Sequence, residues 1–188
     1  MHRRFKQPDA ASVRLFALGA IFLAPLSIGV LLVTSNASQN DNAHQISHDV
    51  ASMYAQGVDF SQRANQNIAL SVADGKGIDV RSKGVLILSK IRIVEASDCS
   101  AAGKCRNEGY PVVTQRYVMG NQDLRASSFG TPAAMDRTSG EVRGWADDPS
   151  ARAADFPANL KSGEVTYAAE CYLTSPESRN GVYARTIF

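Results

Sequence analysis

The chain has 188 residues and a mass of 20.2 kDa, about the size of one domain with an appended segment. Hydrophobic residues make up 44% of it, which is enough for a folded core and argues against a disordered chain. Its 20 basic and 18 acidic residues are interspersed and give a net charge of +2, so the composition argues against a nucleic-acid-binding protein.

The segment 15–33 (LFALGAIFLAPLSIGVLLV) contains no charged residue. At a rise of 1.5 Å per residue it covers nearly the whole hydrocarbon core of a bilayer, about 30 Å, so we expect a transmembrane helix. The leader at 1–14 has four basic residues and one acid, whereas Asp41 is the only formal charge in 34–45. The positive-inside rule therefore predicts a cytoplasmic N-terminus and an exported remainder.

A cleaved signal peptide is the main alternative to an anchor, because residues 35–37 (SNA) resemble a small-residue cleavage site. The apolar run is longer than the roughly 7–15 residues of a signal core, which favours a retained helix. Small or helix-bending residues in lipid-buried helices permit close helix contact. We expect such packing at Gly19, Ala20, Pro25 and Gly29; a plain single anchor is the simpler alternative.

Residues 34–74 are expected to form an amphipathic helical region. Apolar residues recur at intervals of three and four between Ala43 and Tyr54, with polar residues on the opposite side. Gly57 is expected to end this first helix, and Asp59 to cap a second helix that runs to about residue 72.

Residues 75–188 are expected to form an antiparallel β-sheet head. Four runs rich in β-forming residues occur at 84–94, 111–119, 165–173 and 182–188. Turn residues between the last two runs indicate a hairpin. The predicted fold class is α+β, pilin-like, with an N-terminal transmembrane helix and with amphipathic helices packed on one face of a sheet of about four strands.

Side-chain alternation in the first run places Val85, Ile87, Ile91 and Ile93 on one face, which we expect to lie against the helices. The segment 120–163 is rich in Gly, Pro, Ser and charged residues, and we expect a functional or mobile loop there. A short strand at 141–145 is a weaker expectation within it.

The three cysteines fall in a region predicted to be exported and therefore oxidised. Cys99 and Cys105 flank a short flexible loop, SAAGK, that can bring them within bonding distance, so we predict a disulfide between them. Cys171 is predicted to be a buried thiol. A zinc site is not expected, since a closed site needs four ligands and no CxxC pair occurs.

Other chemical signals are weak. His44 and His48 have the spacing of two metal ligands on one helix, but both lie in the polar stripe, which favours a solvated face. Trp145 lies next to Asp147 and Asp148, so it is either an exposed contact or calcium-binding region or, as we expect, a hydrophobic pin for the loop. We predict no catalytic residue, cofactor or metal, and an anchored hydrolase is not favoured.

Three segments carry a family resemblance: HDVASMYAQGVDFSQRANQNIAL at 48–70, GVLILSKIRIV at 84–94 and GVYARTIF at 181–188. Together with the N-terminal apolar helix, they resemble TadE-like proteins of the Tad (tight adherence, Flp-type) pilus assembly machinery. Members of that family often carry a Glu near the start of the apolar segment, whereas 15–33 contains no acid. Neither leader cleavage nor acid-mediated subunit docking is therefore transferred to this chain.

The resemblance implies a non-catalytic pseudopilin of the bacterial inner membrane, with a C-terminal domain in the periplasm or in a surface pilus used for adhesion. Its implied partners are membrane lipid, other pilin-like subunits and the pilus assembly platform, in a homo- or hetero-oligomer. The alternative from a different class is a membrane-tethered extracytoplasmic binding or sensory module, in which the loop at 120–163 holds a ligand.

Overall fold

The computed structural model describes residues 38–99, 104–156, 161, 163–174 and 181–188. The chain divides into two compact units, Met1–Ser38 and Gln39–Phe188. The predicted membrane segment 15–33 lies outside the described residues, and so do Gly19, Ala20, Pro25 and Gly29. Among the residues that are described, no helix is both long enough and apolar enough to cross a membrane.

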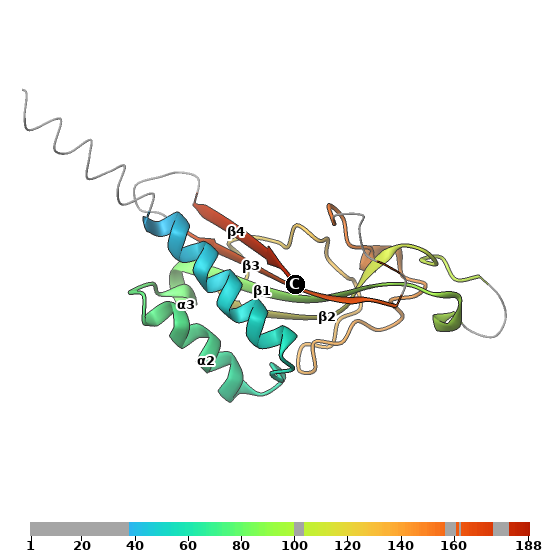
Figure 1. Cartoon of the computed structure of the whole chain (residues 1–188), viewed down its shortest axis with the longest axis horizontal. Coiled ribbons are helices and arrows are strands. Elements are labelled where there is room, and N and C mark those ends of the chain that lie inside the picture. The colour runs from blue at the N-terminus through green and yellow to red at the C-terminus, as the bar shows by residue number, and fades with distance from the viewer. Residues whose placement is uncertain (1–37, 100–103, 157–160, 162, 175–180) are drawn as a thin grey trace, which may run out of the picture. The chain divides into compact units, whose positions relative to one another are not determined.

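The second unit is built on a four-stranded antiparallel sheet (Figure 1). Its strands are β1 (Gly84–Ile93), β2 (Pro111–Gly120), β3 (Val165–Leu173) and β4 (Val182–Ile187). The predicted α+β class and the four predicted strands are confirmed. The order across the sheet is β2-β1-β3-β4, so the segment that joins β2 to β3 has to pass over or around β1.

Helices cover one face of the sheet (Figure 1). They are a helix whose described part spans residues 38–55, α2 (Arg63–Asp74) and the single-turn α3 (Val80–Lys83). Gly57 ends the first helix as predicted: it has φ +88° and its N–H donates to the carbonyl of Tyr54 over 3.0 Å.

The predicted cap of the second helix is wrong. The helix α2 begins at Arg63 after Gln62, and the Asp59 carboxylate accepts hydrogen bonds from the backbone N–H of Ser61 and the side-chain amide of Gln62. Asp59 therefore closes a local turn before the helix, which is the other structure that an aspartate at this spacing stabilises.

A first hydrophobic cluster fills the space between the helices and the sheet. Leu86 and Leu88 of β1 are fully buried in it. Its other large buried members are Ile46, Val50, Tyr54, Phe60, Leu70, Val80, Tyr117, Met119 and Leu173. The ring centres of Phe60, Tyr117 and Tyr167 all lie within 6 Å of that of Tyr54, and all three pack edge to face on it at the end of the 38–55 helix.

A second hydrophobic cluster covers the opposite face of the sheet. It joins Ile91 and Val113 of the strands to Phe129, Val142 and Ala151 of the segment after β2. The expectation that the face with Ile91 would lie on the helices is therefore wrong, because Leu86 and Leu88 occupy that position. In the first half of β1, from Val85 to Leu88, both faces are apolar and buried, so alternation alone could not identify the helix side.

The segment after β2 supplies this second cover. The strand expected at 141–145 is reduced to two isolated bridges, Glu141 with Gln115 and Val142 with Met135. Backbone hydrogen bonds also join Arg116 N–H to the carbonyl of Gly140 and Val142 N–H to the carbonyl of Thr114. These contacts cover the outer edge of β2 at its first half, so part of the long loop acts as a short substitute strand.

Two glycines with the same φ angle test how closely α3 and the start of β1 pack on the end of β2. Gly120 and Gly57 both have φ +88°, but a Cβ at Gly120 would lie 2.6 Å from the carbonyl oxygens of Gly84 and Val80, whereas nothing lies within 4 Å at Gly57. We expect Gly57→Ala to cost about 1–2 kcal/mol of unfolding free energy, from the left-handed conformation alone. Gly120→Ala should cost at least about 1 kcal/mol more because of overpacking.

Urea unfolding of the full chain, followed by circular dichroism, measures both values. Equal losses in the two variants would contradict the close approach of α3 and β1 to the end of β2.

Candidate functional site

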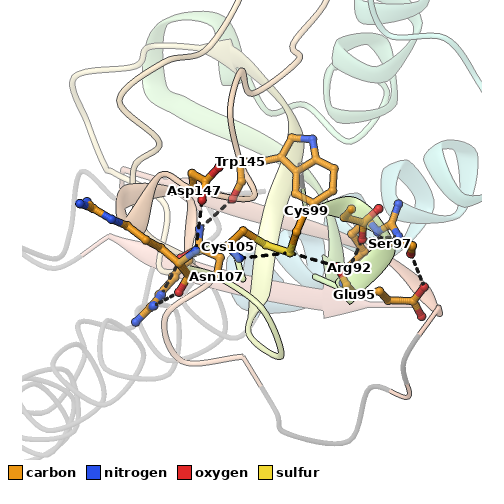
Figure 2. Close-up of a disulfide and its surroundings, with 11 residues drawn as sticks. Arg92, Glu95, Ser97, Cys99, Cys105, Asn107, Trp145 and Asp147 are labelled. Carbon is orange, nitrogen blue, oxygen red and sulfur yellow. Dashed lines mark hydrogen bonds and ion pairs between the residues drawn. A yellow bond between two sulfur atoms is a disulfide. The ribbon is translucent and has the colours of Figure 1, made fainter. Parts of the chain in front are cut away.

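The disulfide between Cys99 and Cys105 is present, the pairing that the short loop predicts (Figure 2). The backbone N–H of Cys105 also donates to the sulfur of Cys99 over 3.3 Å. Cys171 is free and lies in the cluster on the helix side of the sheet. Burial raises the pKa of its thiol to about 12, so this cysteine stays protonated and unreactive at neutral pH.

Asn107, two residues after the disulfide, fastens the end of the sheet to the long loop (Figure 2). Its side-chain amide donates to the carbonyls of Trp145 and Asp148, each over 2.7 Å, and its carbonyl accepts from Nε of Arg152 over 2.8 Å. Its backbone N–H donates to the carbonyl of Ala146. Because the side chain is fully buried, losing these partners would leave polar groups unsatisfied.

Trp145 is the hydrophobic pin that the sequence predicts. It is half-buried, it packs on the second cluster, and the guanidinium of Arg92 lies 5.4 Å from its ring centre. Asp147 accepts from the backbone N–H of Arg106, and the Asp148 carboxylate accepts from the N–H and the hydroxyl of Ser150. Both carboxylates therefore serve local structure, which does not favour the calcium-binding alternative.

The histidine pair lies on the exposed side of the 38–55 helix. His48 is within 3.7 Å of the Asp49 carboxylate and 5.1 Å of the Phe188 ring. Within the described ranges, no three His, Cys, Asp or Glu side chains come together as a metal site would require. The solvated-face interpretation of His44 and His48 fits this arrangement.

Two opposite charges are buried under the long loop, and neither was anticipated. Glu170 of β3 accepts from the hydroxyl of Ser127, from the N–H of Ser128 over 2.8 Å and from the hydroxyl of Tyr183 over 2.7 Å. Arg116 of β2 donates to Ser89 over 3.0 Å and to the carbonyl of Gly130. These bonds connect the strands with the loop at 127–130.

Two opposing effects act on the charge of Arg116, its burial and the nearby carboxylate of Glu170. Burial lowers the pKa of its guanidinium to about 10, while the nearby carboxylate of Glu170 acts in the opposite direction. The group therefore remains charged at neutral pH although it is almost completely buried. Arg116 and Glu170 both bond to the loop at 127–130, and removing either one would leave the other charge buried without compensation.

A groove of about 370 Å³ lies on the helix side of the sheet, past the last turn of the 38–55 helix. Tyr54 in that turn donates to the carbonyl oxygen of the Gln115 side chain over 2.8 Å, and Gln115 in turn lines the groove. The groove is lined by Lys90 and Arg92 of β1, Thr114 and Gln115 of β2, and Glu141 and Trp145 of the long loop. It combines two cations, one carboxylate and one large aromatic ring.

Sequence reasoning missed Asn107, Arg116 and Glu170, which fasten the long loop to the sheet. A signal was present for two of them, since Arg116 and Glu170 are charged residues in the middle of runs of apolar, β-forming residues. In a sheet buried on both faces such residues must be buried and hydrogen-bonded. Asn107 lies in a turn-rich segment, where an asparagine carries no comparable signal.

Replacing Glu170 with Gln tests the buried network. The variant keeps the size of the side chain but turns one acceptor into an NH₂ donor that faces existing donors, and it removes the negative charge near Arg116. We expect a loss of about 2–4 kcal/mol in unfolding free energy. The matched control is Glu141→Gln on the exposed part of the loop, which should change it by less than about 0.5 kcal/mol. Similar values for the two variants would contradict the assigned role of Glu170.

No family model matches the chain, and no curated protein or solved structure is significantly similar to it. The resemblance to TadE-like proteins therefore rests on the segments at 48–70, 84–94 and 181–188. The function of the chain is inferred from its own residues.

Proposed function

We propose that the chain is a non-catalytic, membrane-anchored, pilin-like subunit of a Tad/Flp-type pilus assembly system. The observation that carries this proposal is the order of its parts. An uncharged apolar segment at 15–33 is followed in the sequence by the helix whose described part spans 38–55, and that helix packs on a four-stranded antiparallel sheet. A pilin-like subunit needs such an apolar helix for lipid and neighbouring helices, and a folded head for lateral contacts.

The disulfide supports an exported head. Disulfides form and persist outside the reducing cytosol, and Cys99 is joined to Cys105. The basic leader at 1–14 supports the same orientation, with the N-terminus in the cytoplasm. In this proposal 15–33 spans the inner membrane, and the unit from residue 39 onward lies in the periplasm or in the pilus.

The proposal assigns subunit contacts to the small residues of the membrane segment, Gly19, Ala20, Pro25 and Gly29. Between lipid-buried helices, association depends on close backbone approach at small residues. We therefore expect Gly19→Leu and Gly29→Leu to reduce the recovery of other pilin-like subunits at least tenfold when the full chain is cross-linked in native membranes. Mass spectrometry of the cross-linked material identifies the partners.

The matched control is Phe22→Leu, which exchanges one bulky residue for another in the same segment. It should retain the partners, and all variants should keep the circular dichroism spectrum of the unaltered chain, which shows that the head is folded. Undiminished recovery with both glycine variants would contradict helix packing at these positions. Recovery of no pilin-like subunit even with the unaltered chain would contradict the pilus role itself.

A second candidate is a membrane-tethered extracytoplasmic binding module. The groove beside Trp145 favours it, because a cavity of a few hundred cubic ångströms with a few polar groups around an aromatic ring is typical of ligand sites. This candidate predicts co-recovery of a sensor or transport partner in the same cross-linking experiment.

A further inference from the structure

The groove on the helix side of the sheet is independent of the membrane segment and carries its own chemistry. Lys90 and Arg92 are two residues apart in β1, so their side chains lie on the same face of the sheet. That face also carries Leu86 and Leu88. The last turn of the 38–55 helix ends at this point, so these two cations line open space.

One of the two cations in the groove has no carboxylate partner among the described residues. The nearest aromatic partner of the Lys90 ammonium is the Tyr167 ring, 5.9 Å away, and among the described residues no carboxylate lies within ion-pair distance of it. Arg92 is paired with Asp98 over 2.8 Å. Lys90 is therefore the cation that remains available for a ligand carboxylate, with Arg92 and its counterion fixed beside it.

The remaining groups indicate hydroxyls and an apolar face on the same ligand. Both N–H donors of the Gln115 amide are used, one to the hydroxyl of Tyr117 and one to the carbonyl of Ser139, while its oxygen accepts from Tyr54. Glu141 is exposed at the rim, where its carboxylate accepts hydrogen bonds from hydroxyl groups. The half-buried indole of Trp145 and the partly exposed Val165 provide apolar surface.

We propose that this groove binds an acidic saccharide, a sugar chain whose carboxylate pairs with Lys90. Its hydroxyl groups donate to Glu141, and the apolar C–H face of a sugar ring lies on Trp145. An acidic peptide offers carboxylates without the dense hydroxyl groups that Glu141 requires. A neutral sugar leaves Lys90 without its partner.

The probe for this proposal is an oligomer of galacturonic acid, added to the full-length protein in detergent micelles. Trp145 is the only tryptophan of the chain, so its fluorescence reports directly on the groove. We expect saturable binding that weakens with added salt, because a charge pair contributes to it. Lys90→Gln should weaken binding at least tenfold, whereas Lys90→Arg and the exposed control Lys83→Gln should stay within about threefold.

Several outcomes would overturn the proposal. They are the absence of saturable binding by the unaltered protein, equal binding of a neutral galactose oligomer, and equal binding of polyglutamate. Loss of binding with Lys83→Gln as large as with Lys90→Gln would show non-specific attraction by positive charge. A negative result in the saccharide-binding experiment would not contradict the proposed pilus role. That role is tested by cross-linking, which depends on the membrane segment and not on Lys90.

Discussion

Burial of the central strand on both faces is the constraint on which this structure depends. Strand β1 lies between β2 and β3, with Leu88 under the helices and Ile91 under the loop that follows β2. A strand with two apolar faces exposes one of them to water unless a second layer is supplied. The long β2–β3 segment supplies that layer, so a stretch with almost no regular secondary structure becomes part of the core.

An irregular layer needs fixed points, because it has no ladder of backbone bonds to hold it. Three buried polar side chains provide these fixed points through hydrogen bonds. Arg116 bonds to Gly130, Glu170 to residues 127 and 128, and Asn107 to residues 145 and 148. The disulfide holds the segment that carries Asn107. The groove depends on one of these three side chains, since its loop wall is positioned by Asn107 and by the bridge between Glu141 and Gln115.

Local chemistry made much of the fold predictable from sequence. Runs rich in β-forming residues identified all four strands, Gly57 marked a helix end, and the short loop between Cys99 and Cys105 identified the disulfide. The helix-facing side of β1 was predicted wrongly, since two apolar faces carry no alternation. The groove was not predictable, because it depends on where the helix at 38–55 ends relative to Lys90, a tertiary relation that spacing along the chain does not encode.

Amide hydrogen exchange of the full chain, followed by mass spectrometry, tests the central claim that the loop is a structural layer. Peptides from 127–148 should be protected to an extent comparable with β3, and the slowest amides should lie in β1. Glu170→Gln should release protection at 127–130 before it affects the helices. Exchange of 127–148 at the rate of an unstructured peptide, while β1 stays protected, would contradict the account.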